Sequence, residues 1–197
     1  MEARESKREL IAAAARELFA KYGYKLVSMD TIALKSGVAK GTLYLYFKDK
    51  EELFYYLLDE FLEDMRRMVE KIKSRSLPLH EEVSEVIYRL LMYRKSQKFL
   101  FRIFSEAREL KTQMAQNGVK KIDQLVECYL NDRLSPIAGI EQIKVNVEVL
   151  TFVIMKTYSA LAFEWEETHD PLNERQIAQI IGYLLRNLTA KPQSAER

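Results

Sequence analysis

Apolar residues recur at helical spacing along most of the chain. Near the N-terminus, Leu10, Ala14, Leu18 and Tyr22 repeat every four residues, and Gly23 follows where a left-handed helix cap is favourable. The pattern therefore predicts a first helix over residues 6–22.

A shorter apolar pattern follows and predicts two brief helices. Ser28 is at the N-cap position of the first short helix, and Gly37 supplies the turn between the two helices. The second helix is expected over residues 40–46, with Leu43 and Phe47 as its apolar anchors. Two short helices around a glycine turn are typical of a helix-turn-helix, whose second helix enters the major groove of DNA.

The remaining stripes predict longer helices. The first, over residues 49–73, is too long to belong only to a small head. Further helices are expected over residues 78–94, 99–104, 109–134, 140–165 and 174–187. Asn117-Gly118 leaves open whether its helix is kinked or split, and Ser135-Pro136 is expected to end that helix. The predicted fold class is all-α, with a three-helix N-terminal head and a second helical domain, about nine helices in all.

The charge distribution favours nucleic acid as a partner of the N-terminal part. The 197 residues carry a net charge of +2, but residues 1–50 hold ten Lys/Arg against six Asp/Glu, and the remainder is slightly acidic. Phosphate contacts require a basic excess of this kind. An ordinary solvated helix face explains four charges about equally well.

Composition also narrows the location and the class of protein. Cys128 is the single cysteine, which excludes an intrachain disulfide and suits a reducing compartment. The most apolar stretch, residues 149–155, is far too short to span a bilayer, and no signal peptide is evident. We therefore expect a cytoplasmic protein with no membrane partner.

The sequence offers no catalytic pattern. The two histidines, His80 and His169, each lie beside acidic residues near a helix boundary, and no zinc-protease, Walker A, dinucleotide or nucleophile-elbow motif occurs. We expect no enzyme activity, no cofactor and no metal. A helical adaptor without DNA binding remains the alternative to a DNA-binding regulator.

Residues 28–53, SMDTIALKSGVAKGTLYLYFKDKEEL, resemble the N-terminal signature of the TetR family of bacterial transcriptional regulators. The shared features are the capping serine, Ile32-Ala33, Gly37-Val38, Gly41, Tyr44, Tyr46-Phe47 and Lys50. The resemblance implies a DNA-binding head over residues 1–48, with its motif at 28–47. It also implies a helical ligand-binding and dimerisation domain over residues 49–197, where the sequence matches the family only in length and helical pattern.

The predicted DNA contacts lie on the second helix of the motif and at two helix ends. They are Ser28, Lys40, Gly41, Thr42, Tyr44, Tyr46 and Lys50. The resemblance implies that helix 40–46 reads bases, while Ser28, Tyr46 and Lys50 hold the phosphate backbone. Alternatively, Ser28 only caps its helix, Lys40 is merely solvated and Tyr44 is a core residue. Leu45 departs from the polar or aromatic residue that many members carry.

The resemblance further implies a ligand pocket and a homodimer. The candidate pocket lining is aromatic residues and methionines: Tyr88, Met92, Phe101, Phe104, Met114, Tyr129, Phe152, Met155, Tyr158 and Trp165. The candidate dimer interface is apolar positions of the last two helices: Val147, Ile154, Leu161, Ile177, Ile181, Leu184 and Leu188. For both sets, intrachain core is the alternative. The implied function is a repressor released from a pseudo-palindromic operator by a small apolar or amphipathic effector.

Overall fold

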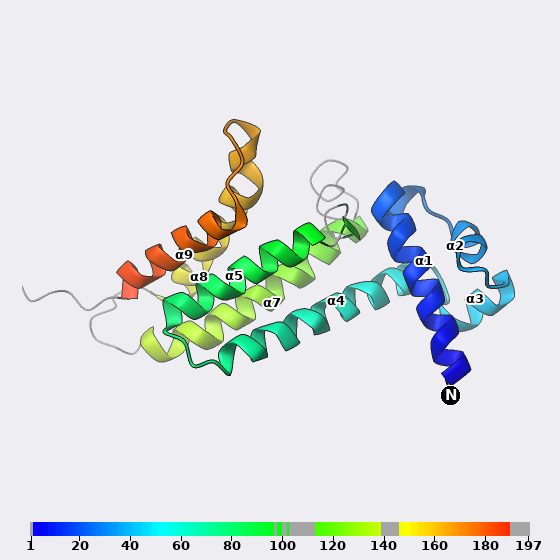
Figure 1. Ribbon diagram of the computed structural model, residues 1–197, viewed down its shortest axis with the longest axis horizontal. Helices are drawn as coiled ribbons and strands as arrows, with labels where there is room; N and C mark the ends of the chain where they lie inside the picture. Colours follow the sequence, from blue (N-terminus) through cyan, green and yellow to red (C-terminus); the bar gives the residue numbers. More distant parts are fainter. Residues whose placement is uncertain (1, 97, 100–101, 103–112, 139–145, 190–197) are drawn as a thin grey trace, which may run out of the picture. The chain divides into compact units, whose positions relative to one another are not determined.

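The computed structural model describes the chain except for residues 1, 97, 100–101, 103–112, 139–145 and 190–197. The described residues contain no strand and form eight α-helices (Figure 1). These are α1 (Glu2–Leu26), α2 (Met29–Ser36), α3 (Lys40–Tyr46), α4 (Lys50–Lys73), α5 (Leu79–Ser96), α7 (Gln113–Ala138), α8 (Val147–Ser159) and α9 (Glu174–Thr189). The predicted all-α class is confirmed. No helix in this described part is both long and apolar enough to cross a bilayer.

Local sequence signals explain where several helices begin and end. Gly23 adopts φ 80° inside α1, which interrupts the helix at the position expected for its cap. At the start of α4, Asp49 accepts a hydrogen bond from the Glu52 amide (2.8 Å), and the Glu52 carboxylate accepts one from the Lys48 amide (2.6 Å). This reciprocal capping satisfies amides that have no partner within the helix.

Helix α7 differs from the sequence prediction at its end. The expected stop at Ser135-Pro136 is wrong, because the helix continues to Ala138 with Pro136 inside it. A proline in the last turn costs only one backbone hydrogen bond, and the Ser135 hydroxyl donates to the Asn131 carbonyl (2.6 Å) in the same turn. Asn117-Gly118 lie within α7 and do not split it.

The last two predicted helices are also partly revised. The helix expected over residues 140–165 is α-helical only from Val147 to Ser159, and a π-helical turn (Ala160–Glu164) and a 3-10 turn (Trp165–Glu167) follow. Its expected first residues, like most of the predicted helix 99–104, lie outside the described part. Helix α9 begins at Glu174, as expected.

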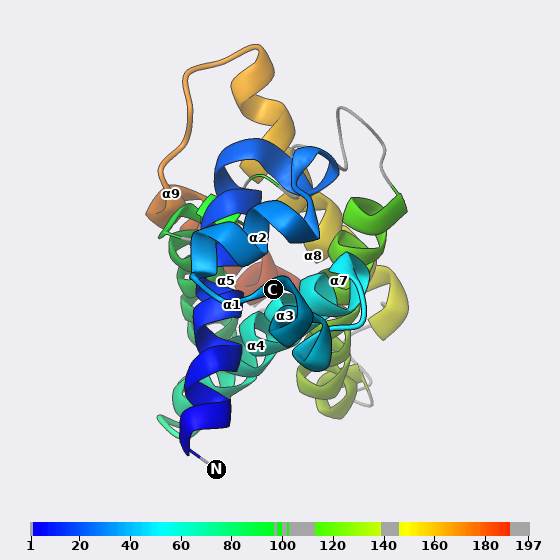
Figure 2. The ribbon, with the colours of Figure 1, turned by 90° about the vertical axis from the view of Figure 1, so that its right-hand side faces the viewer.

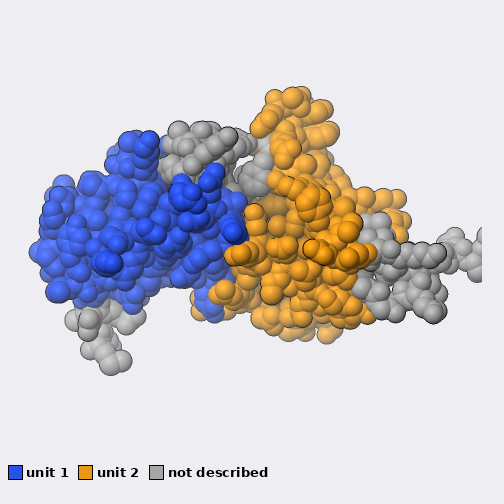
Figure 3. Space-filling view, turned by 180° about the vertical axis from the view of Figure 1, so that it is seen from behind, with its two compact units in different colours: residues 1–65, 94–122 blue, residues 66–93, 123–197 orange. Residues whose placement is uncertain are grey.

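The helices pack into two compact units, coloured separately in Figure 3. Unit 1 comprises residues 1–65 and 94–122, and unit 2 comprises residues 66–93 and 123–197. Helices α4 and α7 therefore each begin in unit 1 and end in unit 2. The division into residues 1–48 and 49–197 concerns function rather than packing, and it stays a prediction.

The core of unit 1 includes a cluster of aromatic rings. Phe99 packs against Phe19 and Phe54, with ring centroids 6.0 Å apart in both pairs, and Tyr24 meets Phe54 edge-on at 5.2 Å. All three phenylalanines are buried. Aromatic pairs at such distances add to the free energy gained from area burial. This cluster joins α1 and α4 to residue 99, which lies far along the chain.

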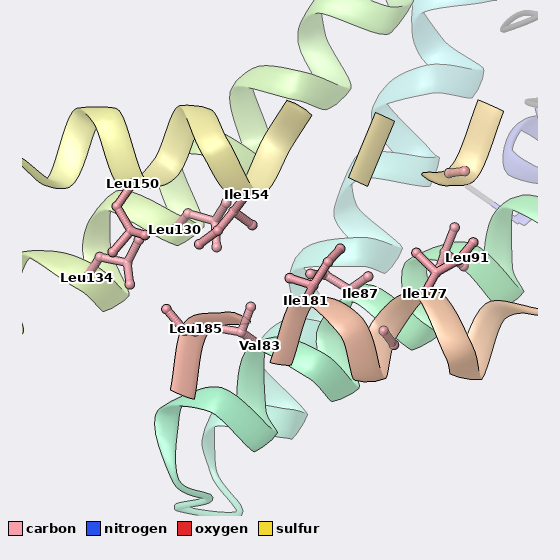
Figure 4. Packing of buried hydrophobic residues seen from close by; sticks show 12 residues of the cluster. Val83, Ile87, Leu91, Leu130, Leu134, Leu150, Ile154, Ile177, Ile181 and Leu185 are labelled. Atoms are coloured by element: carbon pink, nitrogen blue, oxygen red, sulfur yellow. The ribbon is translucent and has the colours of Figure 1, made fainter. Parts of the chain in front are cut away.

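The core of unit 2 is aliphatic and is built from α5, α7, α8 and α9. Figure 4 shows Val83 of α5 beside Leu185 of α9 and Ile87 of α5 beside Ile181 of α9. Leu130 and Leu134 of α7 lie beside Leu150 of α8. These side chains are almost wholly removed from water. Burial of this apolar area is the main favourable contribution to folding of the unit.

One charged group lies inside unit 2. Glu82 is 1% exposed, and Arg133 donates two hydrogen bonds of 2.8 Å to its two carboxylate oxygens. The Tyr129 hydroxyl donates a third (3.0 Å), and burial together with the Glu82 charge raises the pKa of Tyr129, which keeps it protonated. The carboxylate is thus fully engaged, as a buried charge must be.

Removing Arg133 should therefore destabilise unit 2. We expect Arg133→Met to lower the free energy of unfolding by about 3 kcal/mol or more, because Glu82 loses its counter-charge inside the core. Arg89→Met is the matched control, since Arg89 pairs with Glu85 at an exposed position, where loss of a pair costs at most about 1 kcal/mol. Urea denaturation of both variants tests this; equal losses would contradict it.

Candidate nucleic-acid interface

Helices α2 and α3 are joined by a turn with a left-handed residue. The Ser28 hydroxyl accepts a hydrogen bond from the Thr31 amide (3.1 Å), so Ser28 caps α2 as predicted. Gly37 ends α2 at φ 67° and ψ 17°, a conformation that costs glycine little. The chain then turns into α3 within a few residues, which is the connection that a helix-turn-helix requires.

Buried side chains fix the orientation of both helices. Ile32 and Ala33 anchor α2, while Leu43 and Phe47 anchor α3 and its end, and all four are buried. Figure 2 views this part of unit 1 with α2 and α3 toward the reader. Because α3 has only seven residues, burying Leu43 on one side leaves most of its other side chains outside the core.

Five of the predicted DNA contacts lie on α3. Lys40, Gly41 and Tyr44 are exposed, and Thr42 and Tyr46 are half-buried. A Cβ built on Gly41 would meet no heavy atom within 4 Å, so the protein itself does not require a glycine there. The alternative that Tyr44 is a core residue does not fit its exposure.

An ion pair that the sequence analysis missed links the starts of the two helices. Lys40 Nζ lies 2.6 Å from Asp30 Oδ1, and both side chains are exposed. The hydrogen bond to Asp30, together with the carboxylate charge, raises the pKa of Lys40. Asp30 lies in the first turn of α2, where an acid is favoured, and its distance from Lys40 in the sequence hides the pairing. Lys40 is therefore solvated and paired, and it can exchange Asp30 for a phosphate or a base.

Lys50 is the first residue of α4, at a helix N-terminus as predicted, and its side chain has partners within the head. Its Nζ donates to the backbone carbonyls of Tyr24 and Val27, both at 2.8 Å, and lies 4.3 Å from the centre of the Tyr24 ring. The Tyr24 carbonyl lies in the last turn of α1, after the kink at Gly23, and the Val27 carbonyl lies in the α1–α2 connection. The Lys50 ammonium thus holds that connection to the start of α4, so a phosphate contact by its side chain does not follow from this geometry.

Burial around this lysine also affects Tyr24. Removal from water raises the pKa of Tyr24 to about 12, and the nearby Glu51 and Asp49 carboxylates act in the same direction. Tyr24 is therefore a neutral phenol at any physiological pH, and its ring face is available to the Lys50 cation.

Arg8 is a second basic residue of the head that the sequence analysis did not single out. Its guanidinium lies over the rings of Tyr56 (4.4 Å) and Phe47 (5.5 Å). Phe47 follows α3 directly, so this contact from α1 helps to fix the C-terminal end of the reading helix. Helical periodicity alone gave no signal for it, since Arg8 lies off the apolar stripe of α1.

The predicted ligand residues that the structure describes differ in their exposure. Phe152 is 59% exposed, and Met92 and Trp165 are exposed as well. The other described residues of this set are half-buried: Tyr88, Met114, Tyr129, Met155 and Tyr158. Phe101 and Phe104 lie outside the described residues. Phe152, Met92 and Trp165 thus keep a third or more of their surface exposed in this structure.

Several of these side chains have partners of another kind. Tyr88 lies under the Arg175 guanidinium at 3.8 Å, and the Trp165 indole stacks on His169 with centroids 3.9 Å apart. One cavity in the structure, of about 680 Å³, is an open groove along α7. It is lined by Gln124, Glu127, Cys128, Asn131, Asp132, Ser135 and Pro136. None of the predicted ligand residues lines this groove.

The predicted dimer residues are mostly part of the intrachain core. Ile154, Ile177 and Ile181 are buried in unit 2, and Val147 and Leu161 pack against the same cluster. Of the predicted set, Leu184 is exposed, and the side chain of Leu188 lies outside the described part. Most of the apolar stripe read from the sequence therefore packs within the chain, and Leu184 is an exposed member of the predicted set.

A second set of apolar residues on the same helices faces outward. On α8 they are Val149, Phe152 and Val153, and on α9 they are Ile180, Tyr183 and Leu184. Both triplets have the spacing i, i+3, i+4, so each lies on one face of its helix. We call these six residues the α8/α9 patch.

Comparisons with known proteins agree with this architecture. Residues 6–57 match the profile described as bacterial regulatory proteins, tetR family. The uncharacterized HTH-type transcriptional regulator YhgD of Bacillus subtilis is 33% identical over 186 residues, which are 93% of this chain and 97% of that protein.

Solved structures share the fold at low sequence identity. The SmeT–triclosan complex superposes with a TM-score of 0.74 at 11% identity, over 98% of each chain. The regulator FadR from Bacillus subtilis, in complex with stearoyl-CoA, superposes with a TM-score of 0.64 at 21% identity, over 94% of this chain and 99% of FadR.

The family match and the full-length relative agree with the helix-turn-helix seen in unit 1. They place the protein among transcription regulators rather than enzymes. The chain belongs to the tetR family of bacterial regulatory proteins and is a DNA-binding transcriptional regulator.

Proposed function

We propose that this protein is a homodimeric repressor that binds a pseudo-palindromic operator and is released from it by a small apolar or amphipathic effector in the cytoplasm. The observation that carries the proposal is the outward face of α3, which Leu43 and Phe47 hold in place from behind.

Helix α3 is suited to direct readout in the major groove. Lys40 can donate to guanine O6 and N7 or to a phosphate, and Thr42 can contact a base edge or a thymine methyl group. Tyr44 and Tyr46 can donate hydroxyl groups to phosphates. Ser28 keeps its capping role and lies at the N-terminus of α2, whose amides favour a phosphate oxygen.

Selective binding requires two heads held at a fixed spacing. Helix-turn-helix proteins usually achieve this as dimers whose symmetry matches that of the operator. The α8/α9 patch supports such a dimer, because two adjacent helices each expose an apolar face. A twofold axis would place the patch of one protomer against the same patch of its partner and form a four-helix bundle.

Relatives of this fold support an apolar effector. The solved relatives include one in complex with triclosan and one in complex with stearoyl-CoA. An effector that binds one conformation more tightly shifts the population toward it. Helices α4 and α7 run from one unit into the other, so a rearrangement in unit 2 can be transmitted along them and change the spacing of the paired heads.

Replacing Lys40 should weaken operator binding. We expect Lys40→Ala to cost roughly 1 kcal/mol or more per half-site if it contacts a base, or to reduce the salt dependence of binding by about one ion per half-site if it contacts a phosphate. Fluorescence anisotropy with operator DNA at several salt concentrations distinguishes the two. Lys71→Ala, at an exposed lysine of unit 2, is the control; unchanged affinity and salt slope for Lys40→Ala would contradict the role.

Replacing Gly41 should separate folding from DNA binding. The space around Gly41 is open, so Gly41→Ala should raise the free energy of unfolding by about 0.5–1 kcal/mol through the better helix propensity of alanine. The added methyl group should nevertheless weaken operator binding, because it occupies space that a bound duplex would approach. Urea denaturation and anisotropy on the same preparation test this. A variant that is more stable and binds equally well would show that DNA does not approach Gly41.

A charge in the α8/α9 patch should break the dimer. We expect Leu184→Arg to be monomeric by multi-angle light scattering, because two arginines would face each other across a desolvated interface. Leu26→Arg makes the same substitution at an exposed leucine of unit 1 and should leave the dimer intact. If Leu184→Arg remains dimeric, the interface lies elsewhere.

A further inference from the structure

Leu45 is a large apolar side chain on the outer face of the reading helix. It is 78% exposed, whereas Leu43, two residues earlier, and Phe47, two residues later, are completely buried. A leucine contributes little to folding at such a position, since its side chain remains in water. Its side chain is therefore available to contact what α3 binds.

The neighbours of Leu45 on the helix place it where a base pair would be read. Gly41 lies four residues before it and Thr42 three, so all three share one face of α3. Leucine side chains on a helix lean toward its N-terminus, which is the direction of Gly41. Gly41 has no side chain and open space around it, so Leu45 borders a gap that a base edge can enter.

The major groove offers one kind of apolar partner. Guanine, adenine and cytosine present donors and acceptors there, whereas thymine adds a 5-methyl group. Leucine cannot donate or accept a hydrogen bond, so it would remove water from a polar base edge without replacing the lost hydrogen bonds. A thymine methyl group is the one feature of the groove that gains free energy from contact with Leu45.

We infer that Leu45 selects a thymine at one defined position of each operator half-site through apolar contact with its 5-methyl group. The inference rests on the proposed operator binding and adds a specificity that Lys40 and the tyrosine hydroxyls do not supply. It also gives a physical reason for a leucine at the position where many family members carry a polar or aromatic residue.

Deoxyuridine substitution isolates this contact, because uracil differs from thymine only by the missing methyl group. Duplexes that bind the full-length protein are first selected from a random pool at fixed salt. Each thymine of the selected half-site is then replaced in turn by deoxyuridine, and the dissociation constant is measured by anisotropy. The wild-type protein should show one position per half-site where the replacement weakens binding about three- to fivefold, with the effect multiplied when both half-sites are changed.

The Leu45→Ala variant should bind thymine and deoxyuridine equally at that position, while keeping any other methyl dependence. Leu34→Ala is the matched control, because Leu34 is 85% exposed but lies on α2, and this variant should keep the wild-type pattern. Circular dichroism melting of both variants checks folding, which neither exposed site should disturb.

Three outcomes would overturn the inference, and they are distinguishable. If no thymine of the selected site is sensitive to loss of its methyl group, Leu45 reads none. If one position is sensitive but remains so in Leu45→Ala, another group such as the Thr42 methyl makes the contact. If the full-length protein selects no sequence at all, the proposed operator binding itself fails, and the readout by Leu45 fails with it.

Discussion

Burial of Leu43 and Phe47 is the constraint on which the reading head depends. Helix α3 has seven residues, too few to form a stable helix in isolation, so its structure and orientation come from these two anchors. Once they are buried, the helix has no freedom to rotate, and the same residues always face outward. Arg8 contacts Phe47 and Tyr56, and Lys50 donates to the backbone carbonyls of Tyr24 and Val27. These contacts hold the surrounding chain to the same arrangement.

The ion pair between Lys40 and Asp30 gives this head an internal competitor for DNA. In the free protein the Lys40 ammonium is already partnered, so a phosphate or guanine must offer more than the carboxylate does. Since both side chains are exposed, the pair itself is weak. Exchanging Asp30 for a DNA group therefore costs little free energy, and it favours DNA groups that carry more than one hydrogen-bond acceptor.

The head was predictable from sequence because its signals are local. Ser28 as a cap, Gly37 as a left-handed turn and Leu43 as an anchor are each read from a few neighbouring residues, and the structure has them in those roles. The pairing of Lys40 with Asp30 and the inward position of Lys50 depend on how separate segments meet, which periodicity does not record. The same limit explains why Ile154, Ile177 and Ile181 were predicted in the dimer interface although they are buried in the core of unit 2. A clean stripe shows that a helix buries one face, but it does not show whether the cover is the same chain or a second copy.

The way the two units share the chain has a consequence for modularity. The chain passes between them at residues 65/66, 93/94 and 122/123, and unit 1 takes Phe99 from the middle of the sequence to pack on Phe19 and Phe54. A fragment that ends within α4, after Phe54, would leave those two rings without their third partner. The reading head of this protein is thus not an exchangeable cassette. Recombination that grafts it onto another regulator's C-terminal half would have to carry a compatible aromatic residue at the position of Phe99.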